Sequence, residues 1–215
     1  MPLPPSTATR EHLHTRTMRV DAYARDDGQW DLEAELIDVK GYDFPKHDGS
    51  IHVAGQPVHH MHLRVTIDAS FTITEALAAY DAAPYKEHCF CIAPDYKDLV
   101  GMNLLKGFRN AVKARFGRTA GCTHLSELSY ILPTAAVQAM AGRRRKQAGT
   151  ENNAVETEDK TRSTDPAKRP FHIDGCHALR VDSPMTLKFY PQWYVKSSSP
   201  GEDDKAASGS AVSAG

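Results

Sequence analysis

The sequence predicts an α+β fold, in which an antiparallel sheet of hairpins has about three helices packed on one face. Two observations carry this prediction. Apolar and polar residues alternate in two long segments of the N-terminal half, whereas apolar residues recur at helical spacing over residues 97–116. The chain has 215 residues, which suits one domain with tails. Its mean hydropathy of −0.49 is low, so polar segments outside the domain are expected to dilute an ordinary core.

The first hairpin is predicted over residues 18–40. Residues 18–25 alternate, and the run Asp26-Asp27-Gly28-Gln29 has the composition of a turn. A second strand then begins at Trp30 and places an apolar residue at every second position as far as Leu36. The alternation breaks after Leu36, which predicts a bulge or bend near Asp38.

A second pair of strands is predicted over residues 50–54 and 58–69, around Gly55-Gln56-Pro57. The longer strand alternates clearly, and its apolar face consists of Met61, Leu63, Val65 and Ile67. His60, His62 and Arg64 point to the opposite face. His59 lies on the apolar side, at the beginning of the strand.

Three helices follow in the prediction. A short one covers residues 75–81 and ends before Pro84. A longer one runs from about residue 97 to Phe116, with Gly117 as its C-cap. The third begins after Gly121 and continues to about residue 140, and Pro133 is expected to kink or divide it.

Composition divides the chain further. Residues 143–170 contain almost no large apolar side chain, whereas residues 171–196 are rich in aromatic ones. The predicted organisation is a disordered arm (1–16), the main part of a single domain (17–142), a disordered linker or insertion (143–170), C-terminal strands that complete the domain (171–196) and a disordered tail (197–215).

Charge and cysteine usage limit the classes of partner. The chain has 26 basic and 27 acidic residues, which argues against a nucleic-acid binder. It shows neither an apolar stretch long enough for a membrane span nor a secretory signal, so no membrane partner is expected. Its four cysteines form no CxxC pair and indicate free thiols in the cytoplasm. A small-molecule substrate is the expected partner, and a homo-oligomer stays open.

The segment from Gly121 to Glu127 is the most suggestive for chemistry. Cys122 falls at the start of a predicted helix, where free backbone N–H groups favour a thiolate. His124 and Glu127 are three residues apart and therefore share one helical face. A thiolate, an imidazole and a carboxylate together suit zinc or iron. The alternative is purely structural: a capping Thr123, a buried cysteine and a surface pair.

A second cluster lies at the histidines of the long strand. His60 and His62 share a face as two metal ligands would, and Arg64 on that face could anchor an anionic substrate group. The alternative is that this face is simply solvated. Cys89 lies in a predicted loop as a further thiol, and Asp38 is a candidate for an ion pair or for the wall of a site.

In combination, these residues resemble a bacterial family catalogued as domain of unknown function 2889. The resemblance covers about residues 17–142 and 170–195. It is carried by Asp27-Gly28-Gln29-Trp30, Asp38, His59-x-Met61-x-Leu63-Arg64-Val65, Pro84-Tyr85 with Cys89, Gly121-Cys-Thr-His-Leu-x-Glu-Leu128 and Cys176-His-Ala-Leu. The family has no reaction to transfer. The resemblance does favour His59 over His60 and His62, so that His59, Cys122 and His124 would converge between sheet and helices.

The resulting hypothesis is a metal-dependent enzyme of hydrolase or lyase type that acts on a small organic acid or thioester. A divalent metal, zinc or iron, would be bound by His59, Cys122, His124 and Cys89. The predicted catalytic group consists of Glu127 as general acid or base, Arg64 as anion anchor, and Asp38. Two alternatives stay open. One is a non-catalytic binding or assembly module with a structural metal, and the other is a metal-free thiol enzyme that uses Cys122 with His124.

Overall fold

The computed structural model of the protein describes residues 3–140, 169–170 and 172–196. The chain divides into two compact units, Met1–Asn152 and Asn153–Gly215. Of the predicted disordered segments, 143–170 falls almost entirely outside the described residues, and 197–215 falls wholly outside them. Among the described residues, none of the helices has the length and apolar character needed to cross a membrane.

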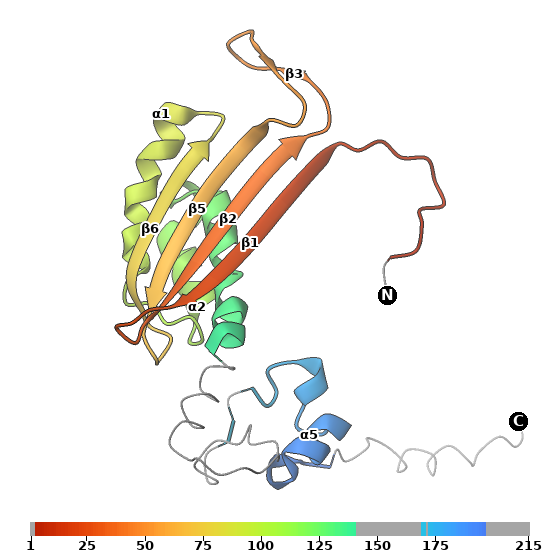
Figure 1. Cartoon of the computed structure of the whole chain (residues 1–215), viewed down its shortest axis with the longest axis vertical. Coiled ribbons are helices and arrows are strands. Elements are labelled where there is room, and N and C mark those ends of the chain that lie inside the picture. Colours follow the sequence, from red (N-terminus) through yellow and green to blue (C-terminus); the bar gives the residue numbers. More distant parts are fainter. Residues whose placement is uncertain (1–2, 141–168, 171, 197–215) are drawn as a thin grey trace, which may run out of the picture. The chain divides into compact units, whose positions relative to one another are not determined.

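Four long strands form one antiparallel sheet in the order β1–β2–β5–β6 (Figure 1). Their bounds are His14–Ala24, Trp30–Lys40, Pro57–Ile67 and Ile73–Ala82. The turn between β1 and β2 contains Gly28, whose φ of 84° is readily adopted only by glycine. β1 begins at His14, inside the segment predicted to be a disordered arm, so the first strand is longer than expected.

The two faces of this sheet differ sharply in burial. On β5, the side chains of Met61, Leu63, Val65 and Ile67 are fully buried, as the alternation predicts. Helices lie over this face (Figure 1), which we call the covered face. The residues between them, such as Arg64, point to the other side, which we call the open face. The predicted α+β fold with helices on one face is therefore confirmed.

A small two-stranded hairpin is inserted between β2 and β5. Its strands, β3 (Phe44–Pro45) and β4 (Ile51–His52), pair with each other and not with the main sheet (Figure 1). The rings of Phe44 and His52 stack at a centroid distance of 4.8 Å across it. The strand predicted over residues 50–54 is thus shorter than expected and belongs to this hairpin.

The predicted helix over residues 75–81 is wrong, because this segment is strand β6. Its three alanines favour a helix by intrinsic propensity, which misled the prediction. The segment as a whole also alternates as a strand does. Ala76, Ala78 and Tyr80 face the helices, whereas Leu77 and Ala79 are exposed. Pairing along β5 overrides the local preference.

The helical layer comes from residues 86–140. It contains α1 (Lys86–Cys89), the 3₁₀ helices η1 (Phe90–Leu99) and η2 (Arg118–Ala120), α2 (Phe108–Phe116), α3 (Thr123–Ser129) and a further helix over residues 132–140. The helix predicted over 97–116 is correct only for residues 108–116, which form α2 and end at Gly117 as expected; before them Gly101 and Gly107 adopt positive φ and interrupt the helix. The third predicted helix is divided just before Pro133, one of the two outcomes expected.

The core lies between the covered face and this layer. Leu32 and Leu63 of the sheet are fully buried, as are Leu99 and Leu128 of the helices. Tyr96 stacks on Phe116 with a centroid distance of 4.3 Å. Continuous apolar packing of this kind gives the rigid support that a site at its edge requires.

The second unit contains short helices where strands were predicted. Its elements are η3 (His177–Leu179), α5 (Pro184–Phe189) and η4 (Pro191–Trp193), and no strand occurs in residues 169–170 or 172–196. Ser183 caps α5 by accepting the Thr186 N–H at 3.1 Å, and Pro184 occupies the first turn. The prediction that 171–196 adds strands to the first sheet is therefore wrong; the aromatic content was mistaken for strand patterning.

Candidate functional site

A carboxylate on the covered face, Asp38 of β2, collects four hydrogen bonds. Arg16 donates two of them, from Nε to Oδ1 at 2.7 Å and from Nη2 to Oδ2 at 2.8 Å. His14 Nε2 lies 3.0 Å from Oδ1, and His59 Nδ1 lies 3.1 Å from Oδ2. Asp38 is only 3% exposed, so these partners replace the water that a surface carboxylate would have.

Strand register explains why these groups meet. Asp38 is paired across the sheet with Arg16 of β1 on one side and with His59 of β5 on the other. The register of β2 against β5 then shifts between Asp38 and Val39, which confirms the predicted bulge. Bulges occur near functional sites because they redirect a side chain at the end of a regular ladder.

Asp38 is held in its charged form. Burial by itself raises the pKa of a carboxyl group, but the hydrogen bonds and charge of the Arg16 guanidinium, the electrostatic interaction with His59 and the hydrogen bond with His14 act more strongly. Together they lower the pKa of Asp38 to about 2. The group is therefore an anion at neutral pH and can bind a cation or orient an imidazole.

Helix α3 brings His124 to the same place. Its ring lies against that of His59 with a centroid distance of 3.9 Å, and its Nε2 is 3.8 Å from Asp38 Oδ2. The potential ligand atoms of Asp38, His59 and His124 all lie within 4.8 Å of one another. Burial, together with the charge of His124, lowers the pKa of His59, which favours the neutral imidazole that a metal requires.

Cys122 precedes α3 and lies beside the outer edge of His124. Its Sγ is 4.0 Å from His124 Nδ1, the ring nitrogen that does not face Asp38. Burial raises the pKa of this thiol, but the imidazole of His124, the Tyr80 hydroxyl and the N–H groups of Leu125 and His124 outweigh that effect and lower it to about 7. Cys122 is thus partly a thiolate at neutral pH.

Two buried tyrosine hydroxyls lie next to Cys122, one beside its backbone and one beside its thiol. Tyr96 Oη lies 2.8 Å from the Cys122 carbonyl oxygen and accepts the Cys122 N–H at 3.1 Å, which fixes the turn before α3. Tyr80 Oη is buried and makes no hydrogen bond of normal geometry, although it approaches the thiol. Burial, followed by this thiol, raises the pKa of Tyr80, so the phenol stays protonated.

Glu127, which lies one turn after His124 on α3, forms an ion pair with Arg16 Nη1. Arg16 therefore bridges Glu127 and Asp38. The side chain of Glu127 is 48% exposed, whereas that of Asp38 is 4% exposed. The site is open to solvent on the side of Glu127 and closed on the side of the core.

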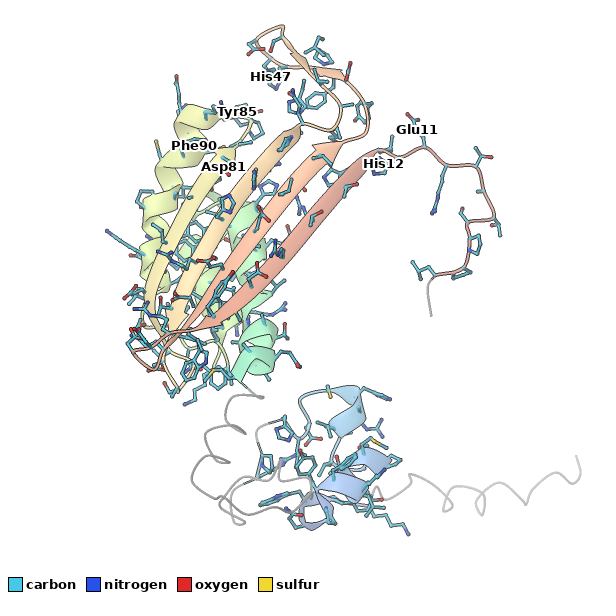
Figure 2. All side chains as sticks on the ribbon, in the orientation of Figure 1. Glu11, His12, His47, Asp81, Tyr85 and Phe90 are labelled. Carbon is cyan, nitrogen blue, oxygen red and sulfur yellow. The ribbon has the colours of Figure 1, made fainter. Side chains whose placement is uncertain are left out.

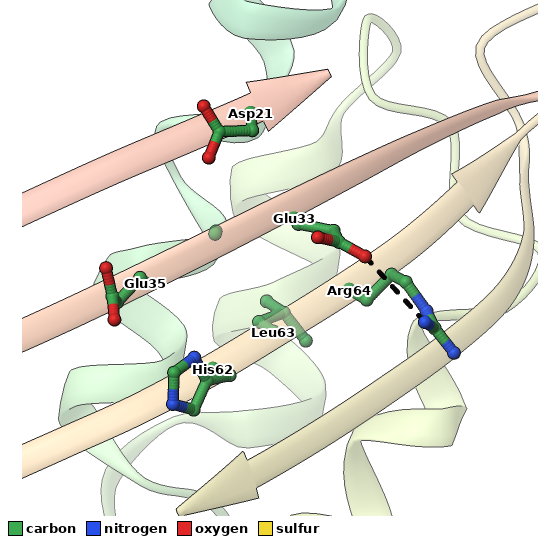
Figure 3. A pocket seen from close by; sticks show the side chains of 7 residues that line it. Asp21, Glu33, Glu35, His62, Leu63 and Arg64 are labelled. Atoms are coloured by element: carbon green, nitrogen blue, oxygen red, sulfur yellow. Dashed lines mark ion pairs between the residues drawn. The ribbon is translucent and has the colours of Figure 1, made fainter. Parts of the chain in front are cut away.

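Two predicted site residues lie elsewhere. Arg64 is on the open face, where its Nη1 is 3.7 Å from Glu33 Oε1 (Figure 3). Because β5 places consecutive residues on opposite faces, the predicted anion anchor cannot reach a site on the covered face. Cys89, at the end of α1, adds to the electrostatic environment of Tyr80 but is not part of the group formed by Asp38, His59 and His124.

His14 and Arg16 were not among the predicted site residues, because both fall in the segment 1–16 that was predicted to be a disordered arm. The signal was present: these residues extend the even-numbered positions of Met18 and Val20, which face the helices, into the preceding segment. Histidine and arginine on the buried side of a strand are uncommon without an acidic partner. Extending the predicted strand by four residues, from Met18 back to His14, would have placed both side chains on its buried side.

Comparison with known proteins identifies a family. A sequence profile described as "Protein of unknown function (DUF2889)" matches residues 14–138, which is more than half of the chain. The matched segment contains all the residues of the site around Asp38. No curated protein and no solved structure matches the chain.

Proposed function

The chain belongs to the DUF2889 family of proteins of unknown function, and from its site we propose that it is a metal-dependent enzyme. The observation that carries the proposal is the convergence of Asp38, His59 and His124, whose ligand atoms lie within 4.8 Å of one another on the covered face. Three groups from two strands and one helix would act as the ligands. The metal would be zinc or iron.

The chemistry of the three side chains supports this choice. Two imidazoles and one carboxylate are the ligands of several catalytic zinc centres and of non-haem iron oxygenases. Such a set leaves coordination positions open for water or substrate, whereas structural zinc sites are closed by four protein ligands. A metal bound there would polarise a carbonyl group or lower the pKa of a bound water.

Cys122 has a different role in this proposal from the one that the sequence suggested. Its sulfur approaches Nδ1 of His124, while Nε2 of the same ring faces Asp38. One imidazole does not direct both nitrogens to one metal ion, so Cys122 orients His124 and is not a fourth ligand. Partners of this kind on the second nitrogen are usual for metal-bound histidines.

The remaining groups suit hydrolysis or lyase chemistry on a small organic acid or thioester. Glu127 is the most exposed carboxylate beside the site and would act as general acid or base. Arg16, at 29% side-chain exposure, replaces Arg64 as the cationic group that would hold a substrate carboxylate, and the His14 ring beside it, at 38%, would donate a hydrogen bond. We also propose a cytoplasmic location, where the free cysteines would stay reduced.

A specific observation favours a second candidate, a metal-free thiol enzyme. The pKa of about 7 at Cys122 provides a nucleophilic thiolate, and His124 is beside it as a base. In this candidate Asp38 would orient His59 and His124 without a metal. Removal of the metal would abolish the activity of a metal-dependent enzyme but not that of a thiol enzyme.

The test is the metal content of full-length protein purified without an affinity tag. We expect about one equivalent of zinc or iron at this site, lost in Asp38→Asn and in His124→Gln and retained in the control His88→Gln, whose side chain is exposed on α1. Retention of all metal in both site variants would exclude the proposal. If the site variants lose the metal but the unsubstituted protein holds it by four protein ligands in a tetrahedral arrangement, the site is closed and the non-catalytic binding module is indicated instead.

A further inference from the structure

We propose that the open face of the sheet carries a second divalent-metal site, in which His60, His62 and Glu35 are the ligands and Asp81 positions the imidazoles. This site lies on the other side of the sheet from Asp38 and shares no residue with the group described above. It does not depend on the proposed function.

The geometry of β5 and β2 brings the three ligands together. His60 and His62 are two residues apart on β5, and their ring centroids are 4.6 Å apart. Glu35 is the register partner of His62 on β2, and its Oε1 is 2.8 Å from His60 Nε2. Figure 3 shows Glu35 and His62 side by side on the two strands. The ligand atoms of these three residues lie within 4.8 Å of one another.

A bulge brings a fourth group to the cluster. Along β6, Ala82 pairs with His60 and Tyr80 pairs with Met61, which leaves Asp81 between them without a register partner. Asp81 lies near the end of β6 (Figure 2), and its Oδ2 is 2.9 Å from His62 Nε2 and 3.5 Å from His60 Nδ1. The extra residue turns a carboxylate toward both imidazoles, as bulges do beside functional sites.

An ordinary solvated strand face does not account for this arrangement. Charged residues on such a face pair across strands, as Glu33 and Arg64 do in the same shallow depression (Figure 3). At His60 and His62, two imidazoles are packed against each other, and each has a carboxylate at hydrogen-bond distance. Histidines that bind a metal through one nitrogen commonly bind a carboxylate through the other.

The chemistry of the ligands points to zinc or a related first-row ion. Imidazole nitrogen and carboxylate oxygen bind zinc, cobalt and nickel, whereas calcium and magnesium prefer oxygen ligands alone. The side chains of His60, Glu35 and His62 are 22%, 31% and 39% exposed, so an ion would reach them from solvent without unfolding.

The experiment measures zinc binding by equilibrium dialysis of the full-length, untagged, metal-stripped protein. We expect His62→Gln and Glu35→Gln each to bind one equivalent of zinc less than the unsubstituted protein. The matched control is Glu33→Gln, which removes an acid from the same face of β2, two residues away, and is expected to bind as the unsubstituted protein does. Asp81→Asn is expected to weaken this site about 10- to 100-fold without abolishing it.

The outcomes separate this proposal from the proposed function. If zinc is lost in Glu35→Gln and His62→Gln but not in Asp38→Asn, the open-face site stands and the proposed function fails. If only Asp38→Asn loses zinc, the open-face site is refuted. Equal loss in Glu33→Gln and Glu35→Gln would also refute it, because the binding would then follow charge alone. Visible absorption of the cobalt-loaded variants provides an independent readout of the coordination.

Discussion

Asp38→Asn tests the electrostatic structure of the site through stability. In the native protein, Arg16 and the two histidines hold the pKa of Asp38 at about 2, against 3.8 for an unperturbed carboxyl group. This difference corresponds to about 2 kcal/mol of folding free energy at neutral pH. Because Asp38 is 4% exposed at its side chain, solvent screening reduces this figure little.

The pH at which this contribution disappears follows from the sign of the shift. A carboxyl group whose pKa is lower in the folded state stabilises the protein above its unfolded pKa, and the contribution is lost as the pH falls toward the folded value. The Asp38 contribution is therefore complete above about pH 4 and is lost between about pH 4 and pH 2. Asp38→Asn should be about 2 kcal/mol less stable at pH 7 and should lack this part of the acid dependence.

The assay is urea denaturation of the metal-free protein and of the variant at pH 7 and at about pH 2.5. Asp98→Asn is the control, because its ion pair with Arg115 is exposed on both sides and contributes less than about 1 kcal/mol. If Asp38→Asn is as stable as the native protein at pH 7, the carboxylate is not held as described. The same conclusion follows if the two proteins lose stability equally at low pH.

Three further predictions follow from single contacts. Alkylation of Cys122 in the metal-free protein should rise with a midpoint near pH 7, because its pKa is about 7; a midpoint above 8 would contradict this. Tyr96→Phe removes the hydroxyl that holds the turn at Cys122 and should cost about 1 kcal/mol in the free energy of unfolding, measured with urea; no change would show that the hydroxyl is replaceable. Leu63→Ala leaves a cavity in the buried face of β5 and should cost about 2 to 5 kcal/mol, and a loss under 1 kcal/mol would indicate a loose core.

Alternation alone was sufficient to predict the central strands. Burial at every second residue of β2 and β5 reproduces the apolar pattern, and the break after Leu36 located the bulge at Asp38. Prediction failed where local preference and tertiary pairing disagree. The alanines of β6 favour a helix in isolation, and only the pairing with β5 makes them a strand.

The site was predicted in part for a related reason. His59 was placed on the covered face by strand parity, and His124 was placed beside Cys122 by its position on a helix; the structure brings both to Asp38. Arg16 was missed because the predicted strand began at Met18, although its alternation continues back to His14; only the pairing with Asp38 is a long-range property. Arg64 was predicted correctly on the face of His60 and His62, but the final hypothesis combined it with His59, which lies on the opposite face.

The most direct test of the metal-site claim is anomalous diffraction at the zinc edge from crystals of the full-length protein grown with zinc. We predict an anomalous peak about 2.0 to 2.2 Å from His59 Nδ1, His124 Nε2 and a carboxylate oxygen of Asp38. Cys122 is predicted to lie outside the coordination sphere, beside His124 Nδ1. The absence of a peak among Asp38, His59 and His124 would contradict the account, and so would a peak coordinated by the Cys122 sulfur.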